Sequence, residues 1–237
     1  MNIALIIAGG RGERMNQDIP KQFINVYDKP VIVYTLEAFQ GHPDIDRIAV
    51  VCLEGWEQIL RAYAKQFNIT KLDVFAMNGS TGQESIKNGI MALKDVCHGD
   101  DIVLVHDAIR PMVSREIISD CIAKCKTHGS AISVIPCNEA ILECSSDRAS
   151  SGKTIPRDSL MRTQTPQAFT YSRILAAHEE ALKRGITNSV ASCTLMIELG
   201  QVVHFSVGSE KNLKLTTVDD IEIFKALLKS EKSDWIK

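Results

Sequence analysis

The chain has 237 residues, of which 45% are hydrophobic and 24% charged, and its 27 basic and 29 acidic residues give a formal net charge of -2. This is the composition of an ordinary globular domain, which excludes disordered, fibrous and disulfide-scaffold classes. A chain of this length buries roughly 70–75% of its unfolded surface, enough for a sizeable core. The nearly neutral charge excludes a general attraction to nucleic acid or to an anionic membrane, so any anion site must be local.

The N-terminal segment MNIALIIAGGRGERM has no basic n-region and becomes glycine-rich too early for a secretory signal. No apolar run approaches the roughly 18 residues of a membrane-spanning helix, so a cytoplasmic protein is expected. The seven cysteines are scattered and form no C-x-x-C pair, which favours small buried side chains over metal or disulfide chemistry. Cys121 and Cys125 lie one helical turn apart and could share a soft metal, but they lack a second pair.

Up to Pro136, short β-rich apolar runs alternate with longer amphipathic stretches. The predicted strands are Ile3–Ile7, Ile48–Cys52, Asp73–Met77, Ile102–His106 and Ala131–Pro136. The predicted helices between them are Pro30–Gln40, Trp56–Phe67, Gln83–Val96 and Ser114–His128. This alternation predicts an α/β, Rossmann-like fold with a mainly parallel sheet flanked by helices. Ligands of such sheets bind beyond the carboxyl ends of the strands.

Beyond Pro136 the alternation is interrupted. Ile141–Cys144 and Lys153–Ile155 are short predicted strands around the Ser/Asp/Gly-rich segment Ser145–Gly152, which predicts a β-hairpin arm at about 137–157. The alternation then resumes, with helices at Ser172–Arg184 and near Ala191–Leu199, a strand at Val202–Val207 and a last helix at Val218–Lys229. Because no linker or repeat interrupts the sequence, residues 1–237 are expected to form one domain that carries this arm.

The first strand leads into Ala8-Gly9-Gly10-Arg11-Gly12-Glu13-Arg14-Met15, where three glycines allow a tight turn that presents N–H groups to a phosphate. A Walker A loop would end in Gly-Lys-Ser/Thr, and the dinucleotide fingerprint that begins at Gly10 would need a glycine at Met15. Both are absent, which argues against a nicotinamide dehydrogenase. Arg11, Arg14 and Lys21 add cations that a simple turn would not require. The segment therefore favours a phosphate-binding loop over an ordinary turn.

AGGRGERM followed by PKQF resembles the opening of the 2-C-methyl-D-erythritol 4-phosphate and ribitol 5-phosphate cytidylyltransferases. The resemblance continues, in the family's order and spacing, through Gly79 to Ser85, VHDAIRP, Arg157, TQTPQAF and NLKLTT. It implies a nucleotidyltransferase that transfers CMP from CTP to a polyol phosphate, with Mg²⁺ as cofactor and pyrophosphate as product. It also implies a homodimer in which each arm crosses a twofold axis and completes the neighbouring site.

The resemblance assigns roles to individual residues. Arg14 and Lys21 match the pair that stabilises the charged α-phosphate, and Lys214 matches a lysine that reaches the phosphates. Such charge stabilisation suffices when the nucleophile is already an anion. The nucleotide-binding residues implied are Ala8, Gly9, Gly10, Gly12, Gly79, Ser85 and Asp107, with backbone groups and the Ser85 hydroxyl reading the cytosine. Without the motif, Lys21 would be interpreted as a solvated charge and Ser85 as a helix cap.

Asp107 follows an apolar strand, where an acidic side chain is costly unless it is paired or exposed in a crevice. By resemblance it is the Mg²⁺ ligand, and a lone carboxylate suits a metal that takes its other ligands from phosphate and water; otherwise Asp107 could cap a helix. Arg110, Arg157 and Thr165 match residues that bind the polyol phosphate, although Arg110 could equally be a structural partner of Asp107. The six histidines form no metal-binding spacing, and His106 is expected to pack in the core.

Several positions depart from the family pattern. Gly82 stands where the family often has arginine, Glu139-Ala140 replace an aspartate-threonine pair, and Asn188-Ser189 replace threonine-aspartate. Because these departures fall on the polyol side, CTP is the firmer expectation and the polyol is left open. Two alternatives remain: a sugar 1-phosphate nucleotidyltransferase that uses another nucleotide, and a non-catalytic nucleotide-binding module.

Overall fold

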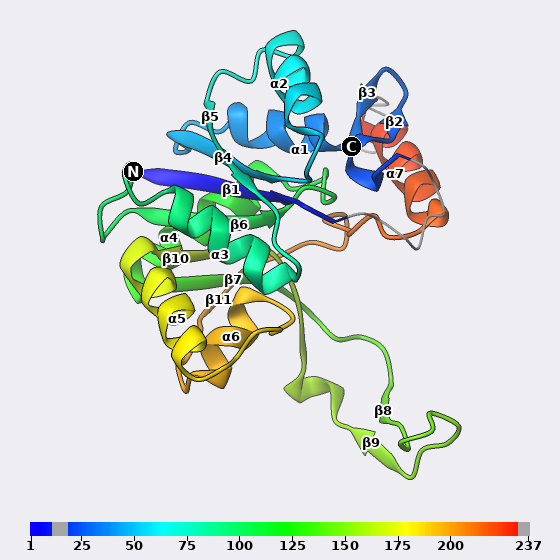
Figure 1. Ribbon diagram of the computed structural model, residues 1–237. Helices are drawn as coiled ribbons and strands as arrows, with labels where there is room; N and C mark the ends of the chain where they lie inside the picture. Colours follow the sequence, from blue (N-terminus) through cyan, green and yellow to red (C-terminus); the bar gives the residue numbers. More distant parts are fainter. Residues whose placement is uncertain (11–18, 232–237) are drawn as a thin grey trace.

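The computed structural model describes residues 1–10 and 19–231. A seven-stranded sheet with the order β11-β7-β10-β6-β1-β4-β5 forms its centre (Figure 1). Every strand of the sheet is parallel except β10, which runs antiparallel to both of its neighbours. The predicted mainly parallel sheet is therefore confirmed. Its strands are β1 (Asn2–Ala8), β4 (Arg47–Cys52), β5 (Leu72–Met77), β6 (Ile102–Asp107), β7 (Ser130–Pro136), β10 (Met161–Thr170) and β11 (Phe205–Val207).

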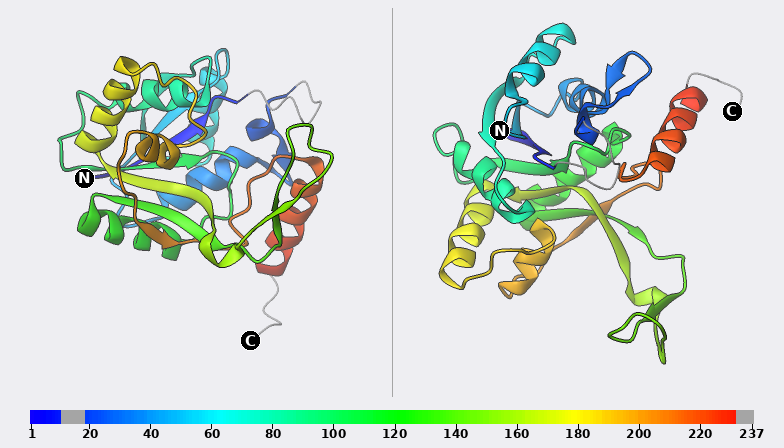
Figure 2. Two further views of the ribbon diagram at one scale, coloured as in Figure 1. Left: turned by 90° about the horizontal axis from the view of Figure 1, so that it is seen from below. Right: turned by 45° about the vertical axis from the view of Figure 1, so that its right-hand side comes forward.

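Helices cover both faces of the sheet because alternate residues of each buried strand point to opposite sides. Ile3 and Leu5 of β1 pack with α3 (Gly82–Ala92), α5 (Tyr171–Lys183) and α6 (Ser192–Glu198). Ala4 and Ile6 pack on the other side with α1 (Val31–Gln40), α2 (Glu57–Gln66) and α4 (Arg115–His128). Figure 2 shows α5 and α6 on one side of the sheet and α4 on the other. None of the described helices is long and apolar enough to cross a membrane.

A smaller apolar cluster joins the last helix to the beginning of the first. Phe224 of α7 (Val218–Glu231) meets Tyr34 of α1 edge-on, with the ring centroids 5.2 Å apart. Val26, from the two-residue strands β2 (Asn25–Val26) and β3 (Lys29–Pro30), and Leu215 belong to the same cluster. The buried Leu215 fixes the segment that carries Lys214 close to the carboxyl end of β6, since its N–H donates to the Ile109 carbonyl.

The predicted hairpin extends away from the body of the molecule (Figures 1 and 2). Its strands, β8 (Ile141–Glu143) and β9 (Lys153–Ile155), pair antiparallel and form a sheet of their own. Leu142 in β8 has an exposed fraction of 62% in the single chain. A hairpin that packs against another surface would expose an apolar side chain in this way when the chain is considered alone.

The structure differs from the sequence-based expectations most clearly in two strands of the central sheet. β10 lies between β6 and β7, where no strand was predicted, and β11 is confined to Phe205–Val207 instead of beginning at Val202. The predicted core histidine is confirmed, because His106 is fully buried and its ring lies 5.0 Å from that of Phe39. Cys121 and Cys125 are buried on α4, and the described residues contain no cluster of metal-ligating side chains.

Candidate active site

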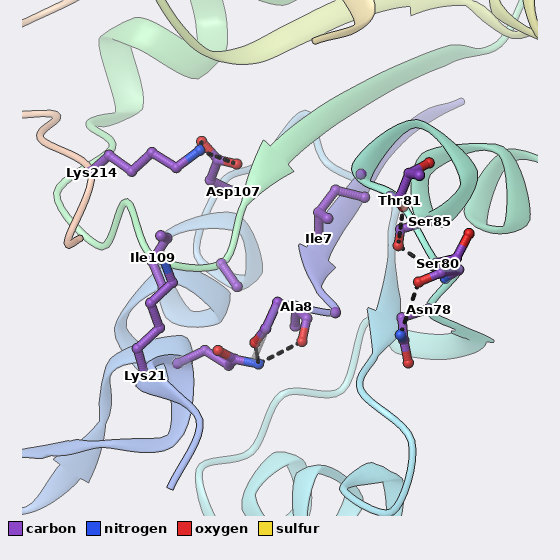
Figure 3. A pocket seen from close by; sticks show the side chains of 16 residues that line it. Ile7, Ala8, Lys21, Asn78, Ser80, Thr81, Ser85, Asp107, Ile109 and Lys214 are labelled. Carbon is purple, nitrogen blue, oxygen red and sulfur yellow. Dashed lines mark hydrogen bonds and ion pairs between the residues drawn. The ribbon is translucent and has the colours of Figure 1, made fainter. Parts of the chain in front are cut away.

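A pocket of about 810 Å³ lies at the carboxyl ends of β1, β5 and β6 (Figure 3). Its position follows from the topology, because the chain passes from β1 to β4 on one side and returns to β6 on the other, leaving a crevice at that switch point. The volume is that of a typical small-molecule site. The lining residues come from β1 and the turn after it, from Lys21 and Gln22, from residues 78–82 and Ser85, and from Asp107, Ala108, Ile109 and Lys214.

The glycine-rich turn after β1 is held by a side chain from the following segment. Gln22, in a short 3-10 helix (Lys21–Phe23), is 1% exposed, and its Nε2 donates to the carbonyls of Ala8 at 2.6 Å and Gly10 at 3.0 Å. At Gly9 a Cβ atom would lie 2.5 Å from the Asn78 Cβ, so only glycine fits there without a shift. The turn and the loop after β5 are therefore in close contact, and Lys21 lines the pocket beside them.

The opposite wall is the turn at the start of α3. Thr81 caps this helix by accepting the Glu84 N–H at 3.1 Å. The Ser85 hydroxyl accepts the Gly79 N–H at 3.0 Å and donates to the Thr81 carbonyl at 2.9 Å. Ser85 therefore holds the turn as well as lining the pocket. A Cβ on Gly79 would lie 2.3 Å from the Glu84 Cγ, so glycine is required there too.

The acidic residue of the pocket, Asp107, carries two cations on its carboxylate. Arg110 Nε donates to Oδ2 at 3.0 Å, and Lys214 Nζ lies 3.2 Å from Oδ2 and 3.3 Å from Oδ1. Burial alone would raise the pKa of Asp107, but the nearby Lys214 and Arg110 charges outweigh burial and hold this pKa below its ordinary value. Asp107 is therefore ionised at neutral pH. The cap of the following helix is Ser114, not Asp107.

A chain of hydrogen bonds supports Asp107 from behind. Thr165 Oγ1 accepts the Asp107 backbone N–H and lies 3.1 Å from His106 Nδ1, while His106 Nε2 lies 3.2 Å from the Arg110 carbonyl. Burial lowers the pKa of His106 to about 4. A neutral ring fits this arrangement when Nε2–H donates to the carbonyl and Nδ1 accepts the threonine hydroxyl. Thr165 thus contacts the backbone of the pocket's acid directly.

One described residue predicted for the site, Arg157, is not brought to it within one chain. Arg157 lies at the base of the arm with an exposed side-chain fraction of 61%, and its Nη1 donates to the Asn138 carbonyl. Gly12 and Arg14 fall outside the described residues. Among the others, Ala8, Gly9, Gly10, Lys21, Gly79, Ser85, Asp107 and Lys214 line one pocket, and Arg110 and Thr165 lie directly behind Asp107.

Sequence reasoning did not identify two residues that shape the pocket. The sequence shows Gln22 only as one residue of the PKQF segment. Its hydrogen bonds to two carbonyls form only when the turn is folded, so the sequence alone does not predict them. Asn78 accepts the Glu54 N–H and donates to the Gly79 carbonyl, which links the ends of β4 and β5. A polar residue immediately after a buried strand was the available signal for Asn78.

Figure 3 shows Asp107 and Lys214 on one side of the pocket and Ser80, Thr81 and Ser85 on the other. One side offers a carboxylate and a lysine, and the other offers backbone groups and hydroxyls. Among the described residues that line the pocket, Asp107 is the one acid, so it suits a divalent cation whose remaining ligands are phosphate oxygens and water. The arrangement can therefore accommodate a nucleotide base at the α3 turn and a metal-bound triphosphate near Asp107.

Comparison with known proteins gives consistent matches over nearly the whole chain. The family model for 2-C-methyl-D-erythritol 4-phosphate cytidylyltransferase matches residues 2–230. A ribitol-5-phosphate cytidylyltransferase of Lacticaseibacillus paracasei is 42% identical over 234 residues, covering 98% of this chain and 100% of the relative. A 2-C-methyl-D-erythritol 4-phosphate cytidylyltransferase of Clostridium acetobutylicum is 37% identical, covering 97% and 98%. The crystal structure of 4-diphosphocytidyl-2C-methyl-D-erythritol synthase from Anaerococcus prevotii shares the fold, with a TM-score of 0.82, 24% identity, and coverage of 97% and 96%.

Proposed function

Because the chain belongs to the 2-C-methyl-D-erythritol 4-phosphate cytidylyltransferase family, we propose that it transfers CMP from CTP to ribitol 5-phosphate and releases pyrophosphate. The choice of ribitol 5-phosphate rests on the sequence identity between this chain and its relatives. Proteins named ribitol-5-phosphate cytidylyltransferase reach 42% and 40% identity, whereas the methylerythritol phosphate enzymes among the reported relatives reach 37%. The departures at Ala140 and Asn188 on the expected polyol side agree with a changed acceptor.

In this reaction an oxygen of the polyol phosphate attacks the α-phosphorus of CTP. A new phosphoanhydride bond forms while the bond from that phosphorus to the bridging oxygen of the β-phosphate breaks, and pyrophosphate leaves with the bonding electron pair. The attacking oxygen is already an anion, so no proton needs to be removed first. Catalysis then depends on positioning and on positive charge around the α-phosphate, which Lys21, Lys214 and, by resemblance, Arg14 would supply.

The backbone of the glycine-rich turn would cradle the phosphates, and the Gly79–Ser85 turn would contact the cytosine. Base selectivity follows if the amides of this turn pair with the cytosine edge, because a wrong base would leave them buried and unpaired. Asp107 would hold Mg²⁺, which neutralises the triphosphate when bound. Arg110, with an 11% exposed side chain committed to Asp107, would keep this carboxylate oriented.

The proposal extends to the assembly and its location. Arg157 and the exposed β8–β9 hairpin would cross a twofold axis and complete the partner's polyol phosphate site in a homodimer. All seven cysteines are free, as expected in the reducing cytoplasm, where CTP is available. The domain of residues 1–237 would then act as one unit with its arm.

Pyrophosphate release tests the proposed function. The purified protein with Mg²⁺ is assayed with each of the four nucleoside triphosphates against ribitol 5-phosphate, 2-C-methyl-D-erythritol 4-phosphate, xylitol 5-phosphate and glycerol 3-phosphate. We expect CTP with ribitol 5-phosphate to give the highest kcat/KM. A higher value with methylerythritol phosphate would contradict the polyol assignment alone. Equal use of several nucleotides, or no turnover at all, would contradict the proposed reaction.

A further inference from the structure

The two cations on Asp107 are held very differently. Arg110 is fixed, because its Nη1 donates to the carbonyl of Asn212 at 2.8 Å and Asn212 is fully buried. The Asn212 amide in turn donates to the Thr165 carbonyl at 2.8 Å. Lys214, two residues further on, has an exposed side-chain fraction of 42%. Asp107 is its only acidic partner among the described residues.

The Lys214 ammonium occupies the open side of the carboxylate. Its Nζ lies within 3.3 Å of both carboxylate oxygens, so it bridges them. Mg²⁺ binds a carboxylate oxygen at about 2.1 Å, and a divalent cation there would be brought close to this ammonium. Two unscreened positive charges at such a distance repel strongly. The metal and Lys214 therefore compete for Asp107, while Arg110 keeps its contact with Oδ2.

Lys214 has an alternative partner within reach once the nucleotide binds. It lines the same pocket as Gly9, Gly10 and Lys21, where the triphosphate is expected. In the unliganded chain its charge is neutralised by Asp107, so it contributes little attraction to an incoming phosphate. If a metal replaces it on Asp107, the lysine becomes available to the phosphates.

We propose that Asp107 withholds Lys214 from the triphosphate until a divalent cation takes its place, and that this exchange makes the pocket select metal-bound CTP over free CTP. The proposal rests on the proposed function, since it requires CTP to bind in this pocket. It gives the Asp107–Lys214 pair a specificity-determining role in addition to the contact that each residue makes with substrate or metal. Metal and lysine binding to CTP are then positively coupled.

The test measures CTP binding by calorimetry with Mg²⁺ and, separately, with a chelator, for the wild type and Lys214→Met. We expect the substitution to weaken binding of Mg·CTP by roughly tenfold or more, the usual size of a coupling between sites. Free CTP should bind within about threefold of the wild type, because Lys214 is withheld in that state. A loss of equal size under both conditions would overturn the proposal, since it would mean that Lys214 contacts the phosphates regardless of metal.

A second comparison uses Asp107→Asn, which should release Lys214 without a metal. In the wild-type background this change is expected to tighten binding of free CTP by roughly tenfold, and in the Lys214→Met background by much less. An equal gain in both backgrounds would contradict the proposal, because loss of one negative charge near a polyanion would then explain it. Lys225→Met, on α7 and paired with Glu222, serves as the control background and should preserve the full gain.

Circular dichroism and thermal melting establish that each variant is folded. Because the two comparisons use different substitutions, the Lys214→Met result decides the question even if Asp107→Asn misfolds. The outcomes also separate this inference from the proposed function. A wild-type protein that binds no CTP even with Mg²⁺ contradicts the proposed function. Tight binding of Mg·CTP with metal-independent effects of Lys214→Met contradicts the exchange alone.

Discussion

At the scale of single residues, the pocket depends on side chains that hold its backbone as well as on side chains that face the substrates. Gln22 supplies one buried amide donor to two carbonyls of a glycine-rich turn. Gln22→Met keeps the volume but leaves both carbonyls without that donor. We expect the unfolding free energy to fall by about 1–3 kcal/mol, and the KM for CTP to rise by roughly tenfold because the turn is no longer fixed.

Gln40→Met is the matched control for this substitution. Gln40 also uses its amide to join two segments, donating to Thr70 Oγ1 and accepting the Lys71 N–H, but it lies outside the pocket. Its replacement should lower stability without changing the KM for CTP. Chemical denaturation and initial-rate kinetics on both variants provide the measurements. Equal KM values for the Gln22 variant and the wild type would show that the turn holds its shape without this amide.

Lys21 carries a second prediction at this scale. It lines the pocket directly beside the glycine-rich turn, where positive charge would stabilise the α-phosphate as negative charge builds up. Lys21→Ala should lower kcat by roughly 10²–10³ at saturating CTP, with the fold unchanged. The exposed Lys65 on α2 provides a lysine control whose removal should leave kcat near the wild-type value. Retention of near wild-type turnover by Lys21→Ala would refute its catalytic role.

At the scale of secondary structure, periodicity predicted the buried parallel strands well because each is a short apolar run. It failed for β10, whose sequence MRTQTPQAFT contains a proline and several polar residues. The buried Gln167 in this strand is held largely by a residue far away in the sequence: its Oε1 accepts the Cys193 N–H at the start of α6, and its Nε2 donates to the Cys193 Sγ. Such compensation of buried polar groups cannot be read from local sequence.

The candidate site could be predicted to a similar extent. The glycine-rich turn, Asp107 and the segment around Lys214 were identifiable from motifs, and the parallel topology brings them to one edge of the sheet. The ion pair between Asp107 and Lys214 could not be predicted from the sequence, since the two residues are 107 positions apart along the chain and meet only through the Leu215 and Asn212 anchors. The motifs identified Asp107 and Lys214 as site residues, whereas long-range packing determines that the two form an ion pair.

A second pocket of about 210 Å³ lies between α3 and α5, and a buried histidine lines it. His178 of α5 lines it with an exposed fraction of 3%, and neither ring nitrogen has a hydrogen-bond partner among the residues that the structure describes. Burial, together with the nearby Lys87 charge, lowers the pKa of His178 to about 4. A neutral ring is tolerated between the helices, but a charged one would be costly.

At the scale of the whole molecule, His178 and His106 make stability depend on pH. Both have a pKa near 4 in the folded chain, against about 6.5 when unfolded. As the pH falls below 6.5 the unfolded chain binds protons first, so stability is full above that pH and declines towards pH 4. Each histidine contributes roughly 3 kcal/mol to the loss. Urea denaturation from pH 7 to pH 4 measures it.

His178→Leu should flatten this decline by removing one of the buried titrating histidines, while filling the site with an apolar side chain. His98→Gln, at an exposed position, is the matched control and should preserve the wild-type slope. If His178→Leu loses stability with falling pH as steeply as the wild type, the buried imidazole does not control the acid response.

The last prediction concerns the arm in the assembled molecule. The hairpin has an exposed Leu142, and Arg157 at its base is also exposed in the single chain. If the arm completes the partner's site, two inactive proteins, Lys21→Ala and Arg157→Ala, should complement each other when unfolded together and refolded as an equal mixture. About half of the dimers are then mixed, and each has one site with both defects and one with neither.

Recovery of about a quarter of the wild-type activity per site is therefore expected. The matched control is a mixture of Lys21→Ala and Lys214→Ala, because these two lysines line the same pocket of one chain and no exchange of arms can produce an intact site. Refolded wild type sets the reference for yield. Recovery in the first mixture alone would show that Arg157 acts across the twofold axis, whereas equally low activity in both mixtures would mean that it serves its own subunit or no site.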